Sequence, residues 1–329
     1  MDEFPDAPIA PRTFPLKRIA IHLLLFVLTL FTTTLAGVQW LTKDPFDLSN
    51  FSYGLPYAVA LCLMLATHEF GHYFAARYHR VDATLPFFLP FPAFPLPDIG
   101  ILNPFGTFGA IIRLRSPMPS RKVLFDIGAA GPLAGFVVSA AVLAYGFMTL
   151  PPVSYLYSIH PEYAQMASIP ESGLRFGTTL LYGIFGKVFA PSGAFIPPMN
   201  EMYHYPFLCV GWFGMFVTAM NLIPIGQLDG GHISYAMFGK RYHMIAQVFL
   251  VFLALVGLAG FLALVGIQIP FGYPMWLLWV FLLVLVMRRI GLNRPPLGDE
   301  TPLDPGRMIL GWTCWVIFVG SFSLTPLIP

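Results

Sequence analysis

The sequence predicts an all-α, polytopic membrane protein with about seven transmembrane helices and one short membrane-associated β or re-entrant segment near residues 85–116. Of 329 residues, 57% are hydrophobic and only 10% are charged, whereas about 25% are charged in an ordinary soluble domain. Long charge-free runs recur along the chain, and a span needs about 20 apolar residues. The stretch 85–116 is too rich in proline for a helix and too apolar for a solvated loop.

The charge-free runs set the expected order of the helices. They place spans near 19–40, 54–78, 123–149, 206–223, 244–268, 273–290 and 308–326. The run 244–287 is divided by PFGYP at 270–274, so we expect two helices joined by a tight turn. Cys62, Cys209 and Cys314 each lie inside a predicted span, without the spacing of a disulfide framework or a zinc motif. We expect them to be small apolar fillers.

The basic residues indicate the orientation. If the N-terminus is cytoplasmic, seven spans put all of the 18 Lys and Arg residues on the cytoplasmic side except Lys43, Arg175 and Lys187, as the positive-inside rule expects. A further apolar stretch, 173–190, would spoil this bias if it crossed the membrane. We therefore expect it to lie in the interface or to dip in and return, within an extracytoplasmic or interfacial insert at about 150–205.

The second predicted span contains three polar side chains, His68, Glu69 and His72, within the pentapeptide HEFGH. On a helix, positions i and i+4 share one face, so both imidazoles can bind one ion. The pattern HExxH is typical of zinc hydrolases, in which the glutamate is the general base. Merely structural histidines are the alternative, which is disfavoured because a carboxylate in lipid costs at least about 2.5 kcal/mol.

A catalytic zinc site needs a third protein ligand and one open position. The best candidate is Asp229, within MNLIPIGQLDGGH at the end of the fourth predicted span. In the seven-span topology, this segment and the HEFGH helix both run toward the cytoplasm, so their polar groups meet at similar depth. His232 is a rival ligand, and His22 and Asp126 are weaker candidates. A simple Asp-Gly-Gly turn, with Asp229 bonding its own backbone, is the alternative.

Asn221 lies in the apolar helix before Asp229. Its amide either bonds a neighbouring helix, a stabilisation of about 0.6 kcal/mol, or holds the substrate carbonyl or oxyanion. The residues alone leave both roles open.

These motifs together resemble the site-2 protease family of intramembrane zinc metalloproteases, whose pattern is HExxH followed by NxxPxxxLDG. The resemblance covers about residues 54–235, with three core spans. The matching residues are His68, Glu69, His72, Asn221, Pro224, Leu228, Asp229 and Gly230. The segments GTFGAIIRLRS (106–116) and GPLAGF (131–136) also look like the family's intervening segments.

The resemblance implies one Zn²⁺ per chain, held by His68, His72 and Asp229. It implies that Glu69 deprotonates the attacking water and passes the proton to the leaving amine. The substrate would be the transmembrane segment of another, single-span membrane protein, cut within the bilayer in regulated intramembrane proteolysis. The segment 106–115 would pair with the unwound substrate as an added strand. The candidate strand residues are Gly106, Phe108, Gly109 and Ile111.

The expected organisation has three parts. Residues 1–53 form a tail and the first helix, 54–235 form the catalytic membrane core, and 236–329 form the C-terminal helices. No transit peptide is evident, so we expect a multi-pass protein of a prokaryotic cell (inner) membrane, with the N-terminus and the loops near the active site cytoplasmic. We expect no nucleic-acid partner, and the sequence leaves the oligomeric state open.

Two other functions compete with an intramembrane protease. HExxH alone permits a zinc-dependent hydrolase of a small lipophilic amide or ester. A non-catalytic metal-binding scaffold or transporter is the other possibility, but a transporter is expected to spread its ligands along a path and to have repeated spans. The sequence shows one compact ligand cluster and no repeat.

Overall fold

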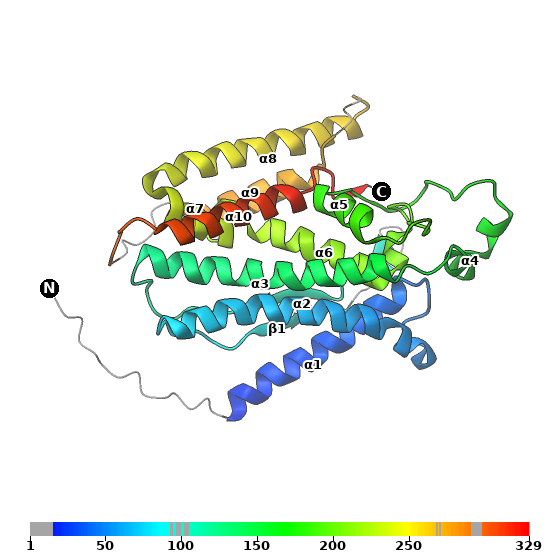
Figure 1. The fold of residues 1–329 in the computed structure, drawn as a ribbon, viewed down its shortest axis with the longest axis horizontal. Helices are drawn as coiled ribbons and strands as arrows, with labels where there is room; N and C mark the ends of the chain where they lie inside the picture. Colours follow the sequence, from blue (N-terminus) through cyan, green and yellow to red (C-terminus); the bar gives the residue numbers. More distant parts are fainter. Residues whose placement is uncertain are drawn as a thin grey trace.

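A computed structural model describes residues 16–92, 95–96, 100–101, 105–267, 269, 271–290 and 298–328. The chain is mostly helical, and its long helices lie side by side along one direction (Figure 1). Seven of them lie within about five residues of the expected spans at each boundary. They are α1 (Leu16–Gln39), α2 (Phe51–Tyr78), α3 (Arg121–Met148), α6 (Pro206–Asn221), α8 (Tyr242–Leu264), α9 (Met275–Ile290) and α10 (Pro305–Ser321).

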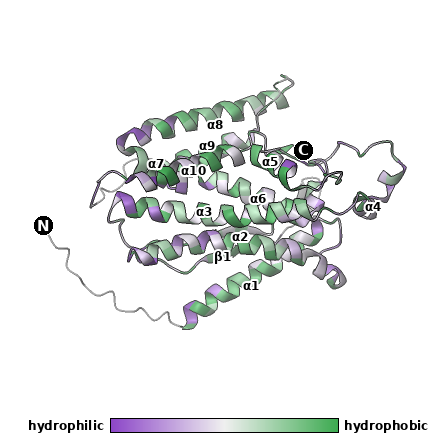
Figure 2. Ribbon diagram, viewed as in Figure 1, coloured by the Kyte–Doolittle hydropathy of each residue, from purple (hydrophilic) through white to green (hydrophobic). Residues whose placement is uncertain are grey.

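Four helical segments of the described chain are long and apolar enough to cross a membrane. They are α1, α2 with the preceding turn η1 (Leu48–Asn50), α3, and the segment Asp229–Leu264, which contains α7 (Asp229–Phe238), η4 (Gly239–Arg241) and α8. Figure 2 shows apolar residues along much of their length. The protein is therefore a membrane protein. Helices α6 and α9 are apolar but shorter, and α10 has only 17 residues, so the count of seven spans stays a prediction.

Side-chain caps determine where several helices begin. The Ser120 side chain accepts a hydrogen bond from the backbone N–H of Val123 at the start of α3. The Asp304 side chain does the same for the N–H of Arg307 in α10. Such caps satisfy backbone donors that have no partner within the helix.

Helix α2 packs against α1 and α3, and α3 packs in turn against α6 and α7. Two glycines allow the close approach. A Cβ on Gly54 would lie 2.0 Å from the carbonyl oxygen of Thr34 in α1, and one on Gly71 would lie 2.6 Å from that of Ala130 in α3. Small residues of this kind let membrane helices touch backbone to backbone. Helix α2, which carries the HEFGH motif, is thus held tightly from both sides.

The proline-rich segment forms strands beside these helices. Strand β1 (Phe87–Pro90) pairs antiparallel with β4 (Thr107–Ile111) and contacts α1. The short strands β2 (Pro95–Leu96) and β3 (Gly100–Ile101) pair with each other. The rest of the predicted segment at 93–94, 97–99 and 102–104 lies outside the described residues.

The segment 150–205 contains only short elements. They are α4 (Ser154–Ile159), η2 (Pro161–Gln165), β5 (Arg175–Phe176), α5 (Leu180–Phe189) and η3 (Met202–His204). Strand β5 pairs with β6 (Leu327–Ile328) near the C-terminus. The 10 residues of α5 extend about 15 Å, half of a hydrocarbon core of about 30 Å. Helix α5 is therefore too short to cross on its own.

Candidate metal centre

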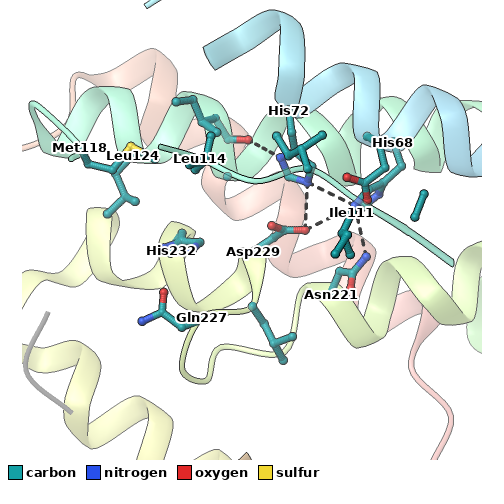
Figure 3. Close-up of a pocket in the computed structure, with 16 residues that line it drawn as sticks. His68, His72, Ile111, Leu114, Met118, Leu124, Asn221, Gln227, Asp229 and His232 are labelled. Atoms are coloured by element: carbon teal, nitrogen blue, oxygen red, sulfur yellow. Dashed lines mark hydrogen bonds and ion pairs between the residues drawn. The ribbon is translucent and has the colours of Figure 1, made fainter. Parts of the chain in front are cut away.

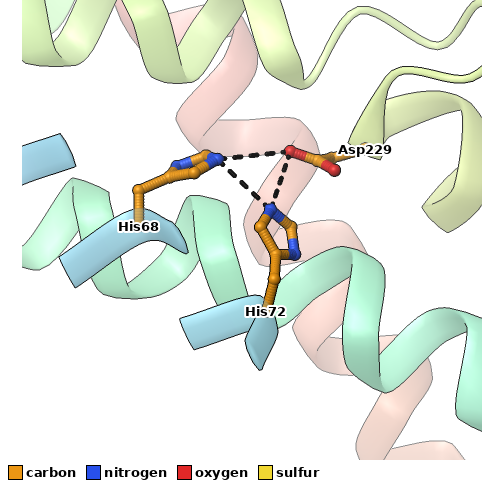
Figure 4. A group of neighbouring side chains, drawn as sticks. All are labelled: His68, His72 and Asp229. Carbon is orange, nitrogen blue, oxygen red and sulfur yellow. Dashed lines mark hydrogen bonds and ion pairs between the residues drawn. The ribbon is translucent and has the colours of Figure 1, made fainter. Parts of the chain in front are cut away.

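Three polar side chains from two elements that are distant in sequence meet inside the helical bundle (Figure 4). His68 and His72 lie on one face of α2, and their Nε2 atoms are 3.2 Å apart. Asp229 is the first residue of α7, and its Oδ2 lies 3.5 Å from Nε2 of His68 and 3.3 Å from Nε2 of His72. Both imidazoles are buried. The structure brings together the three residues that the sequence pattern selects.

The hydrogen bonds around this cluster direct lone pairs inward. The Nδ1–H of His72 donates to the carbonyl oxygen of Ile127, 2.7 Å away, which leaves Nε2 of the neutral ring as an acceptor. The Nε2 of His68 accepts from the amide of Asn221, so it also carries a lone pair. Two nitrogens about 2.0–2.1 Å from a tetrahedral zinc ion lie about 3.3 Å apart, close to the spacing seen here. The three donors therefore fit Zn²⁺.

A glycine-rich turn delivers Asp229 to this position. Gly226 has a φ of +60°, a left-handed conformation that glycine adopts without strain. A Cβ on Gly230 would lie 1.9 Å from the carbonyl oxygen of Leu222, and one on Gly231 would lie 2.5 Å from that of Gly226. The turn is too tight for larger residues, which explains why the aspartate is followed by two glycines.

A cavity of about 300 Å³ opens beside the cluster (Figure 3). Glu69 lines it and is 8% exposed. Ile112, just after β4, lines the same cavity. Gln227 and Leu228, which precede α7, also line the cavity. A carboxylate outside the ligand set thus faces open space next to the ligands.

Asn221 is the last residue of α6 and also lines the cavity. Its Nδ2 donates to Nε2 of His68 over 3.2 Å. The amide therefore bonds a neighbouring helix, α2, at a residue of the ligand cluster itself.

Sequence reasoning missed the glycines that form the wall behind the histidines. A Cβ on Gly131 of α3 would lie 2.1 Å from Nε2 of His72, and one on Gly135 would lie 3.1 Å from Cβ and Nδ1 of His68. These residues belong to the GPLAGF stretch, whose glycine spacing is the signal available in the sequence. The glycines make room for the imidazoles rather than for helix packing alone.

The weaker ligand candidates have other surroundings. The Nδ1 of His22 bonds the carbonyl oxygen of Pro86. Asp126 forms ion pairs with Arg307 at 2.6 Å and His79 at 2.8 Å. His232 lines the cavity but is outside the cluster of converging donors.

The four candidate strand residues divide into two groups. Gly106 packs on α1, because a Cβ there would lie 2.6 Å from the carbonyl oxygen of Thr32. Phe108 and Ile111 on β4 are 66% and 54% exposed, and Ile111 lines the cavity. A Cβ on Gly109 would meet nothing within 4 Å. Three of the four residues are thus accessible, while Gly106 fastens the strand to the bundle.

A helix-borne pair of histidines, a neighbouring glutamate and a distant carboxylate inside an apolar bundle define the class of membrane-embedded metallopeptidases. The model of peptidase family M50 matches residues 56–264. The chain belongs to this family, the site-2 protease family.

Curated relatives agree with this membership. The chain is 31% identical over 252 residues to "Probable zinc metalloprotease EGY1, chloroplastic" of Oryza sativa subsp. japonica, which covers 70% of this chain and 40% of that protein. It is 30% identical over 257 residues to the protein of the same name in Arabidopsis thaliana, with 78% and 40% covered. Identity to "Probable zinc metalloprotease EGY2, chloroplastic" of Oryza sativa subsp. indica is 29% over 219 residues, with 65% and 36% covered. The chain thus spans about two-fifths of the length of these relatives.

Proposed function

We propose that the chain is an intramembrane zinc metalloprotease that hydrolyses a peptide bond in the transmembrane segment of another, single-span membrane protein. The observation that carries the proposal is the convergence of three metal donors next to Glu69, a carboxylate with no role in the cluster, at a cavity bordered by strand β4.

His68, His72 and Asp229 would hold the zinc ion. When bound, zinc acts as a Lewis acid that lowers the pKa of water toward about 7. Glu69 is the proton carrier, because its carboxylate faces the cavity beside these ligands. It accepts a proton from the attacking water and donates it to the leaving amine.

Asn221 supplies a hydrogen-bond donor at the same cavity. Its amide would turn from His68 to the substrate carbonyl oxygen, on which negative charge develops during attack. Donors held in place for such an oxygen contribute strongly to the rate in sites from which water is excluded.

Strand β4 would bind the substrate as an extended peptide. The described pairing of β4 is with β1, and the chain continues from β4 along the cavity through Ile112 and Leu114. A transmembrane helix shields its peptide bonds with its own hydrogen bonds, so it must unwind, and an added strand replaces those bonds. Phe108, Gly109 and Ile111 are the proposed contacts.

Because strand β4 runs along the edge of the cavity, the site favours an extended peptide as substrate over a small lipophilic amide or ester. The placement of Glu69 in the cavity favours an enzyme over a metal-binding scaffold.

The proposed topology keeps seven spans, with the N-terminus and the metal centre toward the cytoplasmic side. The division into 1–53, 54–235 with its insert at 150–205, and 236–329 is part of the same proposal. The relatives are named as chloroplastic, so the expectation of a prokaryotic cell membrane has no support from them. The assignment is therefore to a membrane, without a compartment.

The experiment that tests the function compares the wild type with Glu69→Gln in vesicles containing single-span substrates. We expect Glu69→Gln to keep its zinc and to lower turnover by about 10²- to 10⁴-fold, the usual contribution of a general base. His72→Ala should lose turnover together with the zinc of this cluster. If Glu69→Gln turns over substrate at the wild-type rate, Glu69 is not the general base.

The strand hypothesis has its own test, Phe108→Pro against the matched control Phe108→Ala. Proline removes a backbone N–H that alanine keeps, and one lost hydrogen bond of about 1 kcal/mol lowers kcat/KM about fivefold. Zinc content should be unchanged in both variants. If the proline variant loses zinc, the strand is scaffold instead.

A further inference from the structure

A second cluster of two imidazoles and a carboxylate lies outside the metal centre. His160 follows α4, and Glu201 and His204 lie just before α6. The Nε2 atoms of the two histidines are 3.1 Å apart. The Oε2 of Glu201 lies 3.3 Å from Nε2 of His204 and 3.7 Å from Nε2 of His160. The sequence showed one compact ligand cluster, and the structure brings together a second group of side chains that could hold a metal ion.

The carboxylate of this cluster is buried, and only one of its two oxygens accepts hydrogen bonds from the described part of the chain. Glu201 is 2% exposed and His204 is fully buried. The Oε1 of Glu201 accepts hydrogen bonds from the Tyr163 hydroxyl at 3.0 Å and the Asn200 amide at 3.2 Å. Its Oε2 accepts none from the residues that the structure describes, and it points at the two imidazoles. A buried carboxylate oxygen in this state is costly unless a cation neutralises it.

The outer nitrogens of both rings have partners that favour a proton on Nδ1. The Nδ1–H of His204 donates to the carbonyl oxygen of Trp40 over 2.5 Å. The Nδ1 of His160 lies 3.4 Å from the carboxylate of Glu162. Partners of these two kinds orient metal-binding histidines and set their tautomer. Both Nε2 atoms of the neutral rings then carry lone pairs, directed at each other and at Glu201.

We propose that His160, Glu201 and His204 form a second site for a divalent transition metal, with zinc as the natural occupant. Two imidazoles and one carboxylate are a common donor set for zinc. The distances between donor atoms, 3.1–3.7 Å, resemble those of the first cluster, 3.2–3.5 Å.

The two sites are separate. His204 lies two residues before α6 begins, and Asn221 is its last residue. The 16 residues of α6 extend about 24 Å, so one ion cannot serve both clusters. In Figure 1, α4 and α7 lie at opposite ends of the bundle.

The second site joins the two ends of the 150–205 insert. His160 lies near its beginning, and Glu201 and His204 lie at its end, just before α6. Through its bond to Trp40, His204 also reaches the residues that follow α1. A bound ion would therefore fasten the insert to the end of the bundle.

The test counts zinc per chain in the full-length protein purified in detergent. We expect two ions in the wild type and one in His72→Ala. Adding His160→Gln to His72→Ala should leave none. His160 is the residue of choice because its side chain is 22% exposed, so the substitution disturbs packing less than one at the buried Glu201.

A second measurement replaces zinc with Co²⁺ in the His72→Ala chain, whose first cluster is disabled. Visible absorption of tetrahedral Co²⁺ should be present there and absent in the double variant, while the melting temperatures of the metal-free proteins agree. One zinc in the wild type, none in His72→Ala and no cobalt spectrum would overturn the proposal. In that case a proton shared between imidazole and carboxylate holds the cluster. Neither readout requires proteolysis, so the result is independent of the proposed function.

Discussion

The two histidine–carboxylate clusters use the same donor groups and differ in their surroundings. At the first cluster, Glu69 stands outside the ligand set and lines a cavity of about 300 Å³. At the second, the carboxylate of Glu201 belongs to the ligand set. Its other oxygen, Oε1, accepts hydrogen bonds from Tyr163 and Asn200. Its neighbouring acid, Glu162, lies beside the outer nitrogen of His160.

This difference separates holding a metal from using it. Three converging lone pairs suffice to bind a metal ion. Hydrolysis also needs a general base that does not bind the metal, and space for the substrate. Only the first cluster has both among the described residues. We therefore expect the second to stabilise the fold without cleaving peptides.

Gly131→Ala is expected to have the largest effect, because it should disable the first cluster and leave the second intact. The new Cβ would lie 2.1 Å from Nε2 of His72, and the ring cannot swing away without breaking its bond to Ile127. We expect loss of one zinc per chain and of all detectable cleavage, with the second site intact.

The matched control is Gly183→Ala on α5, where a Cβ meets nothing within 4 Å. It should keep both zinc content and cleavage. Wild-type zinc content and activity in Gly131→Ala would show that α3 or the His72 ring can shift to accept the added Cβ.

A smaller effect is expected from Asn221→Ala. Removing one donor to a developing oxyanion lowers kcat by about 10²- to 10³-fold, while zinc content should not change because Asn221 is outside the ligand set. Single-turnover cleavage together with metal analysis measures both. Asn50→Ala, at the connection between α1 and α2, serves as the control. A rise in KM with kcat unchanged would reassign Asn221 to substrate binding alone.

The smallest effect is expected from a substitution that weakens metal affinity at the second cluster. Tyr163→Phe removes the hydroxyl that donates to Glu201. Loss of such a supporting bond typically weakens metal affinity by about 10- to 100-fold. Competition with a chelator in the His72→Ala chain measures this site alone, and Tyr157→Phe on α4 is the matched control. Equal affinity in both variants would mean that the hydroxyl does not support the ligand.

The sequence could predict what depends on local spacing. His68 and His72 share a helix face because they are four residues apart, and runs of apolar residues located all seven long helices. Asp229 required one more step, the matching of two segments that run toward the same side. Whether α6, α9 and α10 cross the bilayer does not follow from their sequences, because each is shorter than a usual span.

Other features depend on contacts between elements and were out of reach. Gly131 meets His72 only because α3 packs on α2. His160 and His204 are 44 residues apart in a segment without helical periodicity. Their meeting follows from the path of the insert, which no local pattern describes.

The glycine wall also limits where the cleavage preference of this chain can be changed. Behind His72 a Cβ on Gly131 would lie 2.1 Å from Nε2 of the ring, so any larger side chain there disturbs the ligand instead of reshaping the substrate site. Changes in preference for one cleaved sequence over another must arise on the facing surfaces, along Ala110–Ile112 and at Gln227 and Leu228. Libraries intended to retarget cleavage belong at those positions.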